Sequence, residues 1–328
     1  MRTQRQVFFN SDARGITLLS VAVYSLLKTN DPTRPITIFI AHDRPFVDAG
    51  GQTAIEKIVS RFPFATVRFL DFTPVQEEAG EIFRPLLWAF PLCARLLPAD
   101  VKGKIIYLDI DIVVRKDLGE LFDLDLAGAG QLAAAVNESR REHRAYLEAA
   151  GWPTEAGYSF NNATTVVDLD AYRREGISDK IVDWYRAHSS TAINLDQDAQ
   201  NVTFGARTRR LPPKWNYTDG WLERLPKLNP FAREWRVFPP REMIEAILDP
   251  SIVHYIGRRK PTSWTHRPER RLYRQMMNEL GLLPNGRLPG ETASKIVIGW
   301  FFDAYHALLK GYAHLLRHVV RTTSLSAR

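Results

Sequence analysis

The first 136 residues alternate between short apolar runs typical of strands and amphipathic stretches typical of helices. The run 104–109 (Lys-Ile-Ile-Tyr-Leu-Asp) is apolar on both faces, as a central parallel strand would be. Strands that alternate with helices imply an α/β fold with a mainly parallel sheet, whose ligands lie beyond the carboxyl ends of the strands. We expect strands over 6–10, 35–41, 65–71 and 104–109 and helices over 15–28, 53–61 and 85–97, the last kinked at Pro91.

The pattern loosens after Gly151, and long stretches show no clear period. Residues 205–268 are rich in Pro, Trp and Arg and contain few predicted elements. The elements that we expect in this half are strands over 163–168 and 251–256, a helix over 177–188 and a long final helix over 291–321.

Composition excludes several classes of protein. With 45% hydrophobic and 25% charged residues, the 328-residue chain is globular rather than disordered or collagenous. The single cysteine, Cys93, excludes a disulfide framework and a cysteine-rich zinc site. No signal peptide is readable, and the longest uncharged apolar stretch, 16–27, is well short of the roughly 20 residues of a spanning helix. We therefore expect a cytoplasmic protein.

Positive charge is concentrated in one part of the chain. The formal net charge is +7, yet residues 205–274 alone carry sixteen basic and seven acidic side chains. A localised basic surface suggests an anionic partner, such as a nucleotide diphosphate, a phosphorylated glycan, a membrane surface or a nucleic acid. A solvated basic face is the alternative.

Two carboxylates, Asp109 and Asp111, stand one residue apart at the end of the strongest predicted strand. Strand side chains alternate, so both carboxylates project to the same side. Neighbouring anions repel each other unless a cation neutralises them, which favours a divalent metal over two solvated acids in a turn. His254 could complete a site suited to Mn²⁺, with Mg²⁺ as the alternative, or it could be a core histidine.

Gly257 and Lys260 follow His254 in one run, 253–261. Gly257 would let the backbone approach a phosphate closely, and Lys260 could pair with the phosphate charge. Two other polar clusters have ordinary structural explanations as well. Residues 194–198 could cap a helix, and residues 159–162 could form a turn.

The order of the motifs along the chain is more specific than any one motif. Asp12 lies in the loop after the first strand, followed by Tyr-Leu-Asp-Ile-Asp, Phe-Asn-Asn, Leu-Asp-Gln-Asp and His-Tyr-x-Gly-x-x-Lys-Pro. This ordered set, from about Val7 to Trp264, resembles the family-8 glycosyltransferases, which include bacterial lipopolysaccharide galactosyltransferases and glycogenin. The resemblance implies a GT-A fold and the retaining transfer of a hexose from a UDP-sugar to a glycan or lipid-linked acceptor, with Mn²⁺ bridging the diphosphate.

Matching motif positions imply roles at the metal, the nucleotide and the sugar. The implied metal ligands are Asp109, Asp111 and His254, with Asp109 also at the donor. The other implied positions are Asp12 and Arg14 for the uracil and ribose, Gly257 and Lys260 for the diphosphate, Asn161 for the donor sugar, and Asp196 and Gln197 as the catalytic pair beside the anomeric carbon.

The resemblance also implies the domain boundaries. We expect a GT-A catalytic domain over 1–268 and a helical extension over 269–328. Within the catalytic domain, residues 1 to about 136 would form the nucleotide-sugar half, and residues from about 137 to 268 the acceptor-side half.

The chain departs from the family pattern at two places. Asn162-Ala163 replaces a small residue and a glycine, which would narrow the sugar pocket. The donor-binding arginine of the family has no clean counterpart: Arg95 fits if its helix is a turn shorter, and Arg84 lies too far upstream. The donor sugar therefore stays open among glucose, galactose and their relatives.

Two other functions remain as alternatives. Asp109-Ile-Asp-Ile-Val113 also resembles the nucleophile loop of haloacid-dehalogenase phosphatases, although the later Gly-Asp-x-x-x-Asp motif of that family is not found here. A non-catalytic basic module could instead stack bases or sugars on the tryptophans of 205–268. Because acids suited to a metal accompany these tryptophans, we expect sugar binding or core packing and no nucleic-acid partner.

The final helix carries an apolar stripe bordered by basic residues, a pattern typical of helices that lie in a membrane interface. We expect it to dock on the anionic cytoplasmic face of the inner membrane. Packing on the catalytic domain and dimerisation are the alternatives. The stripe is Ile298, Phe301, Tyr305, Leu308, Tyr312, Leu315 and Val319, and the basic border is Lys310, His314, Arg317 and Arg321.

Overall fold

The computed structural model describes residues 5–83, 85–137, 147–152, 159–224, 238–257 and 260–325. The chain divides into two compact units, each assembled from several segments. The first unit comprises Met1–Ser20, Asn30–Ile110 and Leu118–Leu211, and the second comprises Val21–Thr29, Asp111–Asp117 and Pro212–Arg328.

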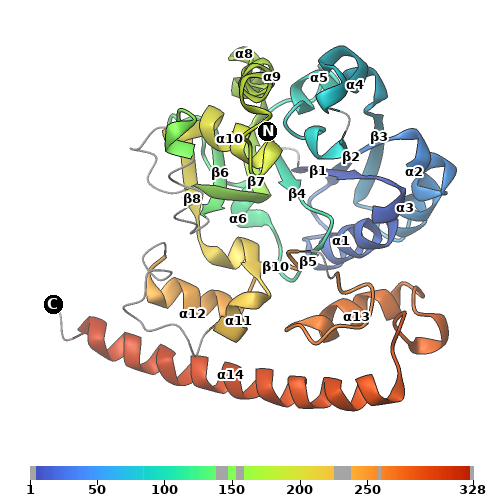
Figure 1. Ribbon diagram of the computed structural model, residues 1–328, viewed down its shortest axis with the longest axis vertical. Coiled ribbons are helices and arrows are strands. Elements are labelled where there is room, and N and C mark those ends of the chain that lie inside the picture. Colours follow the sequence, from blue (N-terminus) through green and yellow to red (C-terminus); the bar gives the residue numbers. More distant parts are fainter. Residues whose placement is uncertain are drawn as a thin grey trace. The chain divides into compact units, whose positions relative to one another are not determined.

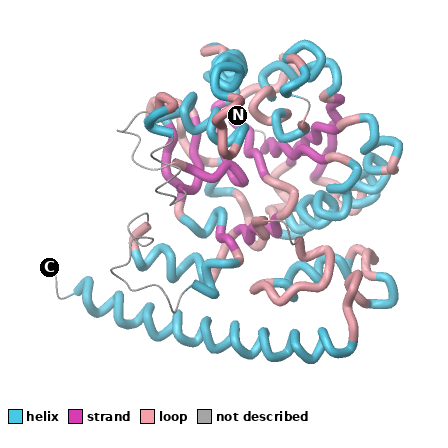
Figure 2. The backbone as a smooth tube through the Cα atoms, in the orientation of Figure 1, coloured by secondary structure: helices cyan, strands magenta, loops and turns pink. Residues whose placement is uncertain are grey.

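A seven-stranded sheet is the centre of the first unit (Figures 1 and 2). Strands β3, β2, β1 and β4 are mutually parallel, and of the seven strands only β7 runs in the opposite direction. The predicted mainly parallel sheet is therefore confirmed. In spatial order the strands are β3 (Ala65–Asp71), β2 (Ile36–His42), β1 (Arg5–Ser11), β4 (Lys104–Leu108), β7 (Phe160–Asp168), β6 (Ala133–Asn137) and β8 (Thr208–Leu211).

The middle strands of this sheet are buried on both faces, as their apolar sequences predict. Every residue of β2 is buried, and so are the last four residues of β4. The ring of Tyr107 in β4 stacks on Phe90, with centroids 4.3 Å apart. Because β4 is held on both faces, the residues that follow it start from a rigid position.

The helix predicted over 85–97 is wrong in extent. The structure has a 3₁₀ turn, Leu86–Trp88, and then only the short helix α5 (Cys93–Leu96). Proline lacks the N–H that a helix interior needs, so Pro85 and Pro91 leave room for single turns alone. The other helices of the first unit are α2 (Arg44–Asp48), α3 (Gly51–Val59), α4 (Thr73–Ala79), α6 (Gly119–Phe122), α8 (Leu169–Arg174), α9 (Ile177–His188) and α10 (Leu195–Phe204).

The second unit contains a three-stranded sheet in the order β5-β10-β9 and several helices. The long α14 packs on α11 and α12 (Figure 1). Among the described residues, no helix has both the length and the apolar character needed to cross a membrane. The elements are β5 (Ile112–Val114), β9 (Tyr217–Thr218), β10 (Ile252–His254), α11 (Gly220–Arg224), α12 (Pro240–Leu248), α13 (Arg270–Glu279) and α14 (Ala293–Leu325), while α1 (Ile16–Thr29) contributes residues to both units.

Candidate active site

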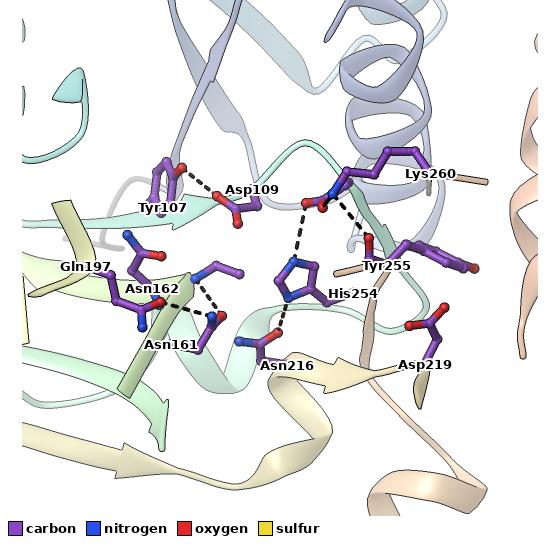
Figure 3. Close-up of polar contacts among 12 residues, drawn as sticks. Tyr107, Asp109, Asn161, Asn162, Gln197, Asn216, Asp219, His254, Tyr255 and Lys260 are labelled. Atoms are coloured by element: carbon purple, nitrogen blue, oxygen red, sulfur yellow. Dashed lines mark hydrogen bonds and ion pairs between the residues drawn. The ribbon is translucent and has the colours of Figure 1, made fainter. Parts of the chain in front are cut away.

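Asp109 is the first residue after β4, and its side chain is held by that strand (Figure 3). The Tyr107 hydroxyl donates to Asp109 Oδ1 at 2.6 Å, and the Asp109 backbone N–H donates to the Ala163 carbonyl at 2.9 Å. The sequence prediction did not include Tyr107. The two-residue spacing could have indicated it, because residues i and i+2 of a strand share a face.

Two consecutive asparagines of β7 reach the first turn of α10. Asn161 Nδ2 donates to Gln197 Oε1 at 3.1 Å, and Asn162 Nδ2 donates to Asp196 Oδ2 at 2.7 Å. Four polar side chains named by the Phe-Asn-Asn and Leu-Asp-Gln-Asp motifs thus meet in the first unit. Burial and the nearby charge of Asp109 raise the pKa of Asp196 to about 8.

The turn before α10 is held by a carboxylate at a position where the sequence suggested ordinary capping. Asp198 is fully buried, and its Oδ2 accepts from the backbone N–H groups of Ile193 and Asn194 at 2.8 and 2.9 Å. Leu195 has a φ of 40°, in the left-handed region that a branched side chain rarely adopts. Asp196 and Gln197 follow this turn directly, so the bonds of Asp198 help to set where both side chains point.

His254 ends β10 in the second unit and is almost fully buried (Figure 3). Its Nδ1 lies 2.9 Å from Asn216 Oδ1, and its Nε2 lies 3.4 Å from Asp111 Oδ1. An acceptor opposite Nδ1 favours a proton on that nitrogen, so Nε2 is the nitrogen that a cation bound beside Asp111 would meet. No motif in the sequence indicated Asn216, which ends the 3₁₀ helix Pro213–Asn216.

Asp111 is surrounded by positive charge within the second unit. The Lys260 ammonium contacts Asp111 Oδ2. Although burial by itself disfavours the ionised form, His254 and Lys260 hold the pKa of Asp111 well below its ordinary value. An ionised carboxylate beside an imidazole nitrogen is a pair of ligand types that fits a divalent cation.

Asp109 and Asp111 belong to different units, but the chain itself keeps them close. Two residues of extended chain span at most about 7 Å. Asp109, Asp111 and His254 are therefore the candidate metal ligands among the described residues. Together they offer two carboxylates and one imidazole, the donor types that the sequence predicted for Mn²⁺ or Mg²⁺.

The predicted nucleotide contacts lie in two loops. Asp12 Oδ1 accepts from Gly15 N at 3.0 Å, and Asp12 Oδ2 accepts from the largely exposed guanidinium of Arg14 at 2.7 Å. Gly257 has a φ of 98°, a backbone conformation that favours glycine. The space where a Cβ would lie is open. Asp12, the predicted ribose contact, caps the start of the 3₁₀ helix Ala13–Gly15.

Arg95, one of two candidates for a donor-binding arginine, forms ion pairs with other residues. Its guanidinium lies 2.5 Å from Asp179 and 3.5 Å from Glu78. Arg84, the other candidate, lies outside the described residues.

Comparisons with known proteins show the family and the fold of the chain. The model of the family described as Glycosyl transferase family 8 matches residues 7–266. General stress protein A of Bacillus subtilis is 28% identical over 265 residues, which cover 77% of this chain and 86% of that protein. UDP-glucose:glycoprotein glucosyltransferase 2 of Homo sapiens is 35% identical over 153 residues, 42% of this chain but only 10% of that protein. The solved structure of the galactosyltransferase LgtC with donor and acceptor sugar analogues is similar with a TM-score of 0.65 at 20% identity, over 88% of this chain and 99% of that one.

Proposed function

This chain belongs to glycosyl transferase family 8, and we propose that it is a retaining transferase that moves a hexose from a UDP-sugar to a glycan or lipid-linked saccharide. Its fold is the GT-A fold that the ordered motifs predicted. Membership of this family favours a transferase over the phosphatase and the basic binding module. The described tryptophans of 205–268 also favour packing over base stacking: Trp215 is 2% exposed, and Trp264 Nε1 donates to the Lys295 carbonyl.

The observation that carries the proposal is the pair of differently held carboxylates after β4. Asp109 is oriented by Tyr107, and Asp111 faces the Nε2 of a buried histidine. Sugar transfer from a nucleotide diphosphate must overcome the negative charge that develops on the leaving oxygen. Acids held in this way suit the binding of a cation that offsets such charge.

Asp109, Asp111 and His254 would hold Mn²⁺, with Mg²⁺ as the alternative. The ion would supply Lewis-acid stabilisation of the diphosphate. Lys260 would add a second positive charge for the leaving group, and Gly257 would let its loop lie close to a phosphate.

Retention of configuration requires either two inversions or attack on the face from which UDP departs. The Gln197 amide is a poor nucleophile, and the Asp196 carboxylate is engaged by Asn162. We therefore favour same-face transfer, in which the departing UDP oxygen accepts the proton of the acceptor hydroxyl. Asn161, by holding Gln197, would keep that amide beside the donor sugar.

UDP release measured on a panel of UDP-hexoses, with and without Mn²⁺, tests the proposal. We expect Mn²⁺-dependent release that falls at least about 100-fold in Asp109→Asn, because the variant loses one charge at the metal. Asp183→Asn, an exposed aspartate of α9, is the matched control and should retain wild-type activity. Near-wild-type turnover of Asp109→Asn in excess Mn²⁺ would contradict the assignment of the metal ligands.

The outer face of α14 supports a second part of the proposal, docking on an anionic membrane at the cytoplasmic side, where a lipid-linked acceptor would lie. The side chains of Phe301 and Leu308 are each 73% exposed, and Leu315 is 66% exposed. Apolar surface arranged along one helix face is typical of an interfacial helix. The basic border is weaker than the sequence suggested, because Lys310 contacts Glu269. The side chains of Val319 and Arg321 lie outside the described ones.

A further inference from the structure

The two asparagines that reach α10 are neighbours in a strand, where successive side chains ordinarily point to opposite faces. The pairing of β7 with β6 explains how both reach the same turn. Ala135 pairs with Thr165, but the next residue, Val136, pairs with Asn161, so residues 162–164 of β7 have no partner in the β6 register. A bulge of this kind bends the strand and redirects a side chain.

Asn162 uses its redirected side chain and its backbone on α10. Its Nδ2 donates to Asp196 Oδ2 at 2.7 Å, and its backbone N–H lies 3.4 Å from Gln197 Oε1. The Thr165 hydroxyl in turn donates to the Asn162 carbonyl at 3.0 Å. Asn162 is itself buried, so its amide has little freedom to turn away.

The turn before Asp196 is stabilised by hydrogen bonds from residues outside it. Leu195, directly before it, has the left-handed φ of 40°, which costs a residue with a side chain about 1–2 kcal/mol. A strained turn persists where the surrounding structure fixes it. Asp198 fixes the backbone of this turn, and the Asn162 amide holds the carboxylate that follows it.

We propose that Asn162 is a positioning residue that fixes one oxygen of Asp196, so that the other oxygen receives a hydroxyl of the donor hexose in one direction only. This inference rests on the proposed function and adds to it a determinant of donor selectivity. Epimeric hexoses such as glucose and galactose differ in the direction of one hydroxyl. A fixed carboxylate distinguishes these directions, whereas a carboxylate that can swing follows either one.

The N–H of Asn162 also favours the ionised form of Asp196, opposing burial and the charge of Asp109, both of which raise its pKa. An ionised carboxylate accepts a hydroxyl hydrogen bond more strongly than a neutral acid does. The 2.7 Å contact therefore fixes the orientation of Asp196, and it also acts on the pKa of that carboxyl in the direction opposite to burial and Asp109.

The test compares kcat and KM for UDP-glucose and UDP-galactose in the wild-type chain, Asn162→Ala and Asn162→Asp. Asn162→Asp keeps the shape but removes the donor, so both variants should lower kcat/KM for the preferred hexose about tenfold or more and bring the ratio between the two hexoses toward one. Affinity for UDP alone should stay within about twofold, because UDP lacks the sugar. Thr165→Val, which removes a bond to the bulge but not to Asp196, is the control and should keep its selectivity.

The outcomes separate the two proposals. Wild-type selectivity in both Asn162 variants, in a chain that is active on UDP-hexoses, would overturn the positioning role alone. An equal loss of affinity for UDP and for UDP-hexose would overturn it too, by showing a general effect on the fold. A wild-type chain inactive on every UDP-hexose would overturn the proposed function and this inference with it.

Discussion

At the scale of one residue, the carboxyl of Asp196 lowers the stability of the fold at neutral pH. Its pKa is raised to about 8 by burial and by Asp109, whereas an unfolded aspartate has a pKa near 4. The folded chain therefore takes up a proton here, and the fold loses stability as the pH rises from about 4 to about 8.

We expect Asp196→Asn to stabilise the fold at pH 7.5 while it lowers transfer activity. The amide is neutral in the folded and the unfolded chain, so the variant avoids the cost of protonating this carboxyl on folding, and the gain should be on the order of 1 kcal/mol because Asp196 is partly exposed. Thermal unfolding at pH 4 and pH 7.5, together with UDP release, measures both effects. The gain should shrink toward pH 4, and a lower melting temperature of the variant at pH 7.5 would argue against a strained carboxyl.

Asn216 is a second residue whose effect passes through a neighbour. Its Oδ1 accepts from His254 Nδ1 and so leaves Nε2 as the nitrogen that would bind a metal. Removing such a partner typically weakens metal binding about 10–100-fold. We expect that loss in Asn216→Leu, measured by titration with Mn²⁺, and little loss in Asn216→Asp, which retains an acceptor. Equal Mn²⁺ affinity in wild type and Asn216→Leu would refute this role.

At the scale of elements, one carboxylate joins α13 to α1 inside the second unit. Glu279 accepts from Lys28 at 2.6 Å, from Gln275 at 2.9 Å and from Tyr24 at 2.9 Å. These bonds, that of Lys28 first, lower the pKa of Glu279 to about 2. The stabilisation is therefore fully present above the unfolded pKa, near 4.5, and is lost as the pH falls toward 2.

Glu279→Gln should lower the free energy of unfolding by about 0.5–1 kcal/mol at pH 7, a modest value because the ion pair is partly exposed. The difference from wild type should narrow between pH 4.5 and pH 2. Denaturant unfolding at pH 7 and pH 3 checks both statements, with Glu245→Gln as a control, since its partner Arg241 lies in the same helix. A difference independent of pH would show that the ion pair contributes nothing.

At the scale of the whole molecule, the exposed stripe of α14 predicts membrane docking. The full chain should float with anionic liposomes at low salt, and Phe301→Ser combined with Leu308→Ser and Leu315→Ser should abolish flotation. Point variants are preferable to truncation, because the opposite face of α14 buries Leu309 and Ala313.

A variant with Ile82→Ser and Ile193→Ser removes exposed apolar surface elsewhere and should float like wild type. A full chain that does not bind anionic liposomes, or a stripe variant that still floats, would leave packing or dimerisation as the role of α14.

The division into a catalytic domain, 1–268, and a helical extension, 269–328, stays a prediction.

Local pattern by itself determined strands β1 to β4, the class of fold and the position of the acids. Each depends on a short stretch of sequence: apolar runs identify β2 and β4, and the two acids follow directly after the end of β4. The glycine expected to allow close approach, Gly257, does have the left-handed φ that other residues avoid.

Only the tertiary structure decided what depends on distant segments. Periodicity does not say which strand pairs with which, so neither the reversed β7 between β4 and β6 nor its bulge could be predicted. That pairing brings Asn162 to Asp196, and the packing of the 3₁₀ helix Pro213–Asn216 brings Asn216 to His254. The sequence determined which groups are present, and long-range packing, which no local period encodes, decided which of them meet.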